Sequence, residues 1–217
     1  MRSTTISRWT IAGRTKAALL CVSCVALVAL AAAPAASAGT LIDRLGGSCP
    51  EQVLRQPFLR WLDPAEYTLV PGGHFERAAK RWQLDGAVVG DGNEPFFVHR
   101  PGESKSLSLP AGSSATSPVM CTTLLHPTIR LFARRSGSAL STLQVEVLFE
   151  GLGGGVRSAS VGLIAAGTNW QPTLPIPVVA NIVALLDGGQ TPVAFRFTPV
   201  GPATWSIDDF YLDPKRH

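Results

Sequence analysis

The acidic side chains with the most informative spacing lie near opposite ends of the chain. Asp208 and Asp209 stand in Trp-Ser-Ile-Asp-Asp-Phe-Tyr-Leu, and Glu76 stands far upstream in Gly-Gly-His-Phe-Glu. The apolar alternation shifts at the two aspartates, which predicts a β-bulge. Bulged carboxylates, with Glu76 brought alongside by pairing of the first and last strands, would give calcium hard oxygen ligands. Alternatively, one aspartate caps a turn and the other is solvated, since the dense Asp-x-Asp-x-Asp-Gly calcium loop is absent.

A tryptophan flanked by amides marks a second candidate site. Trp170 lies between Asn169 and Gln171 in a polar stretch. An exposed indole can stack on the C–H face of a sugar, while side-chain amides bond the hydroxyl groups. The sequence therefore predicts a shallow surface at Trp170, Asn169 and Gln171 that binds a neutral or mildly charged polysaccharide weakly and without calcium.

Other aromatic residues have packing as the competing interpretation. Trp82 and Trp205 lie within apolar strand patterns, so we expect both in the core. Phe96 and Phe97 follow a polar turn and form another candidate platform, with packing at a sheet edge as the alternative.

Sequence motifs of catalysis are missing. The chain has no Gly-x-Ser-x-Gly elbow. Its histidines lack the spacing of a zinc site; they are His74, His99, His126 and His217. In a regular strand the adjacent Asp208 and Asp209 would point to opposite faces and could not act as an acid–base pair. We therefore predict a protein that is not an enzyme, although a Ser-His-Asp site is recognised by geometry rather than by sequence.

The first 38 residues have the pattern of a secretory signal peptide. Basic residues precede an apolar stretch from Ala17 to about Ala33, and the small triplet Ala36-Ser37-Ala38 follows. The stretch is short for a membrane span, and Pro34 argues against a continuing helix. We predict cleavage after Ala38 and a secreted, extracellular or cell-envelope location, with an uncleaved anchor as the alternative.

Removal of this segment changes the charge of the chain. The full sequence has 19 Lys and Arg, 15 Asp and Glu, and a formal net charge of +4. Four of the basic residues and none of the acidic ones precede Gly39, so the mature chain carries 15 of each sign. The balance predicts no nucleic-acid partner, and we expect no membrane partner after cleavage.

Cys49 and Cys121 remain after cleavage. In an oxidising compartment two such cysteines most often form a disulfide, and two free buried thiols are the alternative. A bridge across this long loop would stabilise the fold by on the order of 4 kcal/mol. The predicted Cys49–Cys121 bridge would tie the N-terminal segment to the rest of the protein.

Short apolar runs follow Asp63-Pro64, separated by Gly, Pro, Asn and Ser, as is typical of an antiparallel β-sandwich. In the clearest strand, Thr142–Glu150, apolar and polar residues alternate. Gly151–Gly155 is predicted to join it to the next strand as a hairpin, and Val178–Leu186 is ambiguous between strand and helix. Further strands are expected at Trp82–Val89, Ser106–Leu109, Thr128–Arg135, Val156–Ile164, Val193–Thr198 and Trp205–Leu212.

These patterns divide the chain into three parts. Residues 1–38 form the predicted signal peptide, 39–64 an irregular N-terminal strap, and 65–217 the β-sandwich domain. The strap has no sustained period, and its apolar residues Phe58, Trp61 and Leu62 are expected to cover one edge of the sandwich.

Separated segments of the chain resemble a known family. They are Pro71–Glu76 followed by Trp82, then Gly102–Leu109, and finally Trp205–Leu212. In order and spacing they resemble the calcium-containing jelly-roll carbohydrate-binding modules, which share a galactose-binding-like fold. The resemblance covers roughly Tyr67 to Asp213. It implies an all-β jelly roll with a structural calcium held by Glu76 and an aspartate of the closing strand, whereas the strap and the cysteines are not part of the family pattern.

The leading hypothesis is a secreted, non-catalytic module that binds a polysaccharide or cell-envelope glycan. A structural or protein-interaction domain of the cell envelope is the alternative, and a small hydrolase is the third hypothesis. A groove with exposed aromatic and amide side chains would favour the first, and a flat apolar patch the second. A pocket with convergent histidine and carboxylate groups would favour the third.

Overall fold

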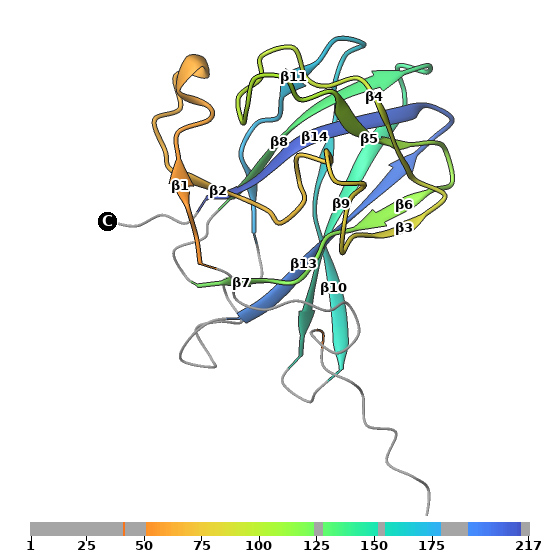
Figure 1. The fold of residues 1–217 in the computed structure, drawn as a ribbon. Helices are drawn as coiled ribbons and strands as arrows, with labels where there is room; N and C mark the ends of the chain where they lie inside the picture. Colours follow the sequence, from red (N-terminus) through yellow and green to blue (C-terminus); the bar gives the residue numbers. More distant parts are fainter. Residues whose placement is uncertain (1–40, 42–50, 124–127, 152–154, 179–190, 214–217) are drawn as a thin grey trace, which may run out of the picture. The chain divides into compact units, whose positions relative to one another are not determined.

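Two antiparallel β-sheets face each other, which confirms the predicted sandwich (Figure 1). The structure is a computed structural model, and it describes residues 41, 51–123, 128–151, 155–178 and 191–213. The predicted signal peptide lies outside the described residues, as does most of the ambiguous segment 178–186. In the described part of the chain, no helix is long and apolar enough to cross a membrane.

The larger sheet is built around β14 (Thr204–Asp213). β8 (Thr128–Ser136) pairs with one side of β14 along its length, while β5 (Lys105–Leu109) and β2 (Tyr67–Leu69) follow one another along the other side. The remaining strands extend this sheet outward: β4 (Val88–Asp91) beside β5, β1 (Leu54–Arg55) beside β2, and both β11 (Gln171–Pro172) and β12 (Ile176–Pro177) beside β8.

The smaller sheet has β13 (Thr191–Val200) and β9 (Thr142–Glu150) at its centre. β10 (Val156–Ile164) pairs with β9, and the Gly151 N–H donates to the Gly155 carbonyl at 3.1 Å, as expected for the predicted hairpin. The other strands of this sheet are β6 (Ser114–Thr116) and β7 (Met120–Thr122) beside β13, and β3 (Gln83–Asp85) beside β6.

Alternating side chains build the core between the sheets. In β9, Leu143, Val145 and Val147 are fully buried, whereas Gln144 and Glu146 are partly exposed, as predicted. Side chains of β5, β8, β13 and β14 meet these residues from the other strands. The sandwich is therefore held by apolar burial along strands whose alternation is visible in the sequence.

The region around Trp82 differs partly from the prediction. Trp82 and Trp205 are 7% and 0% exposed and lie in the core, as expected. The single strand predicted over 82–89 is wrong, because the chain turns at Gly86, whose φ is 67°. β3 and β4 on either side of this turn belong to different sheets. A left-handed glycine thus moves the chain from one layer to the other.

The N-terminal strap packs on the outer face of the larger sheet. Phe58 is fully buried, and its ring centroid lies 5.0–5.6 Å from those of its neighbours. Together they form the outer aromatic cluster: Phe58, Tyr67, Phe132 and Tyr211. Trp61, in the 3-10 helix η1 (Leu59–Trp61), packs against this cluster. The expectation for Leu62 is wrong: it ends η1 in the left-handed conformation, and 93% of its surface is exposed.

Candidate functional site

A β-bulge interrupts β14 at the two predicted aspartates. Asp208 lies opposite Phe132 on β8, and the pairing resumes at Tyr211 opposite Arg130, so β14 has an extra residue in this interval. Asp209 adopts a φ of 45°. The bulge predicted from the apolar pattern is confirmed, and it leaves both aspartates fully buried.

The backbone that follows β2 fills a gap beside this bulge. β5 pairs with β14 before the bulge and β2 pairs with it afterwards. Between them the Val70 N–H donates to the Phe210 carbonyl at 2.9 Å, and the Phe210 N–H donates to the Gly73 carbonyl at 3.1 Å. A Cβ at Gly73 would lie 3.0 Å from two carbonyl oxygens, so this close approach needs glycine. The contact carries His74 and Glu76 to the bulge, as the predicted pairing of first and last strands requires.

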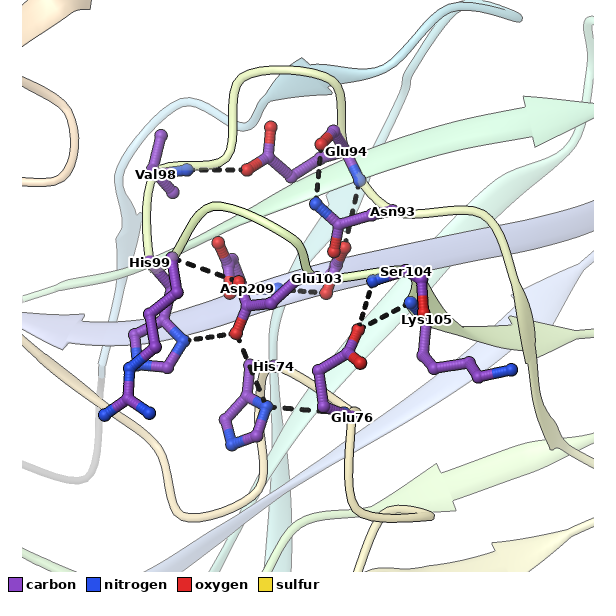
Figure 2. Close-up of polar contacts among 12 residues, drawn as sticks. His74, Glu76, Asn93, Glu94, Val98, His99, Glu103, Ser104, Lys105 and Asp209 are labelled. Carbon is purple, nitrogen blue, oxygen red and sulfur yellow. Dashed lines mark hydrogen bonds and ion pairs between the residues drawn. The ribbon is translucent and has the colours of Figure 1, made fainter.

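Glu76 is held at the start of β5. Its Oε1 accepts hydrogen bonds from the backbone N–H groups of Ser104 and Lys105, both at 2.6 Å (Figure 2). Its charge contributes to the raised pKa of Asp209. The structure thus places Glu76 near Asp209, but the ligand atoms of Glu76, Asp208 and Asp209 do not all lie within 4.8 Å of one another.

The loop between β4 and β5 supplies two further carboxylates, which no sequence pattern had indicated. Glu94 is fully buried and accepts hydrogen bonds from the N–H groups of Phe96 at 2.5 Å and Val98 at 2.8 Å. The Glu94 N–H donates to Asp208 Oδ2 at 3.0 Å. The Glu103 side chain, at the end of the loop, is 7% exposed. Both glutamates reach the bulge through loop conformation, which leaves no periodic signal in the sequence.

Five carboxylates thus gather around the bulge. We term them the acidic cluster: Glu76, Glu94, Glu103, Asp208 and Asp209. Burial, followed by repulsion from Asp209, raises the pKa of Asp208 to about 9. Burial, followed by repulsion from Glu103 and Glu94, raises the pKa of Asp209 to about 8, while the backbone N–H of His99 lowers it (Figure 2). Neither Asp209 carboxylate oxygen has a hydrogen bond of normal geometry among the described residues.

Two histidines lie beside the acidic cluster, although they are far apart in sequence. The imidazole rings of His74 and His99 stack with 4.9 Å between their centroids. Glu103 Oε1 lies 2.5 Å from His99 Nδ1 and 3.7 Å from His74 Nδ1 (Figure 2). Burial, followed by repulsion from His99, lowers the pKa of His74. These side chains line a cavity of about 370 Å³ together with Arg77 and Arg100.

The arrangement is suited to holding cations. Calcium prefers carboxylate oxygens, and the buried Asp209 carboxylate, which accepts no hydrogen bond of normal geometry from the described residues, fits that preference. Convergent histidine and carboxylate groups also occur in hydrolases, which is the feature expected of the third hypothesis. The residues that line this cavity include no serine, threonine or cysteine, so they supply no side-chain nucleophile for covalent catalysis.

The predicted sugar-binding residues lie at β11, on the edge of the larger sheet. Asn169 and Gln171 are exposed, whereas Trp170 is partly buried against the outer aromatic cluster. The guanidinium of Arg134 lies over the Trp170 ring, 4.9 Å from its centroid. The indole is thus contacted by a cation as well as by apolar neighbours.

A larger cavity of about 710 Å³ lies next to β11. Its lining includes Gln171, Trp61 and the buried Arg130, together with Leu163 and Leu174. The two leucines are 63% and 83% exposed. Trp61 was expected only to pack against the sandwich, because its place at the same cavity as Gln171 depends on how the strap folds over the sheet.

Phe96 and Phe97 do not form a common platform. Phe96 is partly buried and packs edge-on against Trp61, with 4.9 Å between ring centroids. Phe97 has a φ of 51° and is 44% exposed. The packing interpretation therefore describes Phe96, which supports the aromatic wall of the larger cavity.

Of the predicted disulfide pair, Cys121 lies on β7 and is 4% exposed. Cys49 lies outside the described residues. The Cys49–Cys121 bridge stays a prediction.

No protein-family model and no curated protein matches this chain. Similar solved structures include carbohydrate-binding modules. The CBM22-1–GH10 modules of Clostridium thermocellum endo-1,4-β-D-xylanase 10B, solved with xylohexaose, are 11% identical with a TM-score of 0.47, over 66% of this chain and 28% of that one. The CBM22-1 xylan-binding domain of Paenibacillus barcinonensis Xyn10C is 13% identical with a TM-score of 0.46, over 67% and 93%. A CBM61 module in complex with β-1,4-galactotriose is 18% identical with a TM-score of 0.38, over 67% and 97%.

Proposed function

We propose that this chain is a non-catalytic module that binds a glycan outside the cytoplasm. The observation that carries the proposal is the cavity of about 710 Å³ that Trp61 and Gln171 both line. Indoles bind the C–H faces of sugars and amides bond their hydroxyl groups. Trp170 and Asn169 directly precede Gln171, so we include them in the ligand surface. The signal-peptide pattern of the first 38 residues supports the proposed location.

Arginine–aromatic contacts hold the rings of this surface in place. The Arg60 guanidinium carbon lies 5.8 Å from the Trp61 ring centroid and 5.2 Å from that of Phe96, and Arg134 covers Trp170. Rings that are already fixed lose little conformational freedom when a ligand binds. Such a surface suits a neutral or mildly charged polysaccharide. We expect a binding free energy of about 4 to 8 kcal/mol, which corresponds to dissociation constants in the micromolar to millimolar range.

We also propose that Glu76, Asp208 and Asp209 hold a structural calcium ion. Support comes from the burial of both aspartates and from the Asp209 carboxylate, which accepts no hydrogen bond of normal geometry from the described residues. Calcium would supply positive charge to carboxylates that repel one another, and its oxygen ligands need no fixed geometry. These residues would then hold the segment after β2 against the bulge of β14.

A glycan panel, screened with and without calcium, tests the sugar-binding proposal. Trp61→Ala and Trp170→Ala are each expected to lose binding while circular dichroism shows an intact sandwich. Leu140→Ala is the control, because it shortens a 93% exposed side chain that does not line the cavity. A silent panel for the intact protein, or full binding by both tryptophan variants, contradicts the proposal. If Trp170→Ala unfolds the domain, Trp170 belongs to the core and not to a sugar platform.

Exposed leucines favour a second candidate, a protein-interaction domain of the cell envelope. Leu163 and Leu174 stand at the same cavity, and Leu62 directly follows Trp61. Exposed apolar side chains of this kind suit a protein partner better than a sugar. Leu174→Ser separates the two candidates: unchanged sugar binding supports the glycan module, whereas a silent panel with lost cross-linking to an envelope protein supports the interaction domain.

A further inference from the structure

We propose that His74, His99 and Glu103 bind a transition-metal ion, best matched by zinc, at a site separate from the calcium ligands. One ligand atom from each of the three side chains lies within 4.8 Å of the others. Two imidazole nitrogens and one carboxylate oxygen make a zinc donor set, which leaves a fourth position for water or a ligand. Calcium takes oxygen ligands, so this set selects a different class of ion.

Two of the three ligand-atom distances are close to bonding geometry, but at least one imidazole must rotate, because the rings stack with 24° between their planes and a metal ion lies in the plane of each ring that binds it. Ligand atoms of a tetrahedral zinc with bonds of about 2.1 Å lie roughly 3.4 Å apart. Glu103 Oε1 is 3.7 Å from His74 Nδ1 and 2.5 Å from His99 Nδ1, so the first contact closes slightly and the second opens by less than about 1 Å. His74 Nδ1 accepts a long hydrogen bond of 3.3 Å from the Glu76 N–H. In this contact the nitrogen acts as a hydrogen-bond acceptor, the state that metal binding also requires.

The surroundings orient the ligands and favour a cation. Glu103 Oε2 accepts a hydrogen bond from the Arg100 N–H at 3.2 Å, which fixes the carboxylate and leaves Oε1 directed at the imidazoles. Beside this group lies the fully buried Asp209, whose oxygens have no hydrogen bond of normal geometry among the described residues (Figure 2). The opposing charges at the cavity are Arg77 and Arg100, and both are exposed to solvent.

An ion can reach this site from solvent. The three side chains keep between 7% and 18% of their surface exposed. They line the cavity of about 370 Å³, which has room for an ion and its water. The partly exposed side chains and the cavity therefore allow a metal ion to bind from solvent and to dissociate again.

Calorimetric titration of the mature chain with Zn²⁺, in excess calcium, tests the proposal. We expect one zinc per chain, with affinity reduced at least about tenfold by His74→Ala, by His99→Ala and by Glu103→Gln. Glu146→Gln is the matched control, because Glu146 lies on β9 in the smaller sheet and pairs with Arg196. Its zinc affinity should equal that of the parent chain.

A spectroscopic measurement keeps the test decisive if one variant fails to fold. Co²⁺ bound by this set should show the visible absorption of a tetrahedral nitrogen–oxygen site, and each folded variant of the three should lose it. Absence of zinc binding by the intact chain overturns the proposal. If zinc affinity and the Co²⁺ spectrum stay unchanged in all folded variants, the ion binds elsewhere, and this result also overturns the proposal.

Discussion

Replacing Asp209 by asparagine measures how much the buried charge of the acidic cluster lowers the free energy of unfolding of the metal-free protein. Asparagine keeps the shape of the side chain and carries no charge at any pH. Burial and neighbouring carboxylates raise the pKa of Asp209 from 3.8 to about 8 in the folded chain. Between these two pH values the folded chain holds a proton that the unfolded chain has lost. The free energy of unfolding therefore falls as pH rises through this interval.

The size of the effect follows from the width of that interval. For a group that binds one proton in the folded chain and none in the unfolded chain, the free energy of unfolding falls by about 1.4 kcal/mol per pH unit. From pH 3.8 to pH 7 the cost reaches about 4 kcal/mol, and Asp209→Asn removes it. Repulsion from Asp209 also raises the pKa of Asp208, so its removal acts in the same direction. In excess chelator the variant should be more stable than the parent by up to about 4 kcal/mol at pH 7, and about equal near pH 4.

Urea unfolding at pH 4, 5.5 and 7 is the assay, with each chain measured in chelator and in calcium. Calcium should reverse the order at pH 7, because the parent gains an ion that the asparagine variant holds poorly. Asp85→Asn is the control, since Asp85 is exposed on β3 and its replacement should change stability little.

Two results would refute this reasoning. A less stable Asp209→Asn chain in chelator at pH 7 would mean that the charged carboxylate has partners that the structure does not give it. A difference of equal size at pH 4 and pH 7 would trace the effect to packing, because ionisation alone depends on pH.

Three further predictions concern the metal, the core and the cysteines. Calcium should raise the melting temperature and chelator should lower it; a temperature that responds to neither means that no calcium is bound. Trp82→Ala removes a side chain that is 7% exposed and should cost about 3 to 5 kcal/mol in chemical denaturation, whereas Leu84→Ala, at a 37% exposed position, should cost little. Intact mass after alkylation without reductant should show Cys49 and Cys121 unmodified, and two added alkyl groups would rule out their bridge.

Strands with strict alternation could be predicted from the sequence because burial of one face imposes a period of two. β9 shows this, with the predicted bounds Thr142–Glu150 and with Leu143, Val145 and Val147 buried. β10 also has the predicted bounds, Val156–Ile164, although a register shift between Ser160 and Gly162 interrupts its alternation. The single strand predicted over 82–89 was wrong because the apolar pattern does not show which sheet each half of the segment joins. The turn at Gly86 decides that, through a backbone conformation that depends on tertiary packing.

The candidate site was predictable where it follows strand geometry. The bulge at Asp208 and Asp209 left a visible shift in the apolar pattern, and pairing of β2 with β14 brought Glu76 to it. Glu94 and Glu103 gave no such signal, because they lie in a loop whose path is fixed by hydrogen bonds to its own backbone. Side chains on loops of this kind meet in space without sharing any spacing in sequence.

The acidic cluster and the proposed sugar surface share this loop. Glu94 accepts hydrogen bonds from the N–H groups of Phe96 and Val98, and Phe96 supports Trp61 at the wall of the larger cavity. No residue of the acidic cluster lines that cavity, so a cation held by the acidic cluster has no direct contact with a sugar in the cavity. Its influence can pass through Phe96, or through Phe132, which lies opposite Asp208 on β8 and packs against Trp61 with 5.3 Å between ring centroids. A ligand that acts by holding one ring in place can shift affinity only by the free energy that favours that position. Glycan binding should therefore persist without calcium, and calcium should change its affinity only by a modest factor and leave the choice of glycan unchanged.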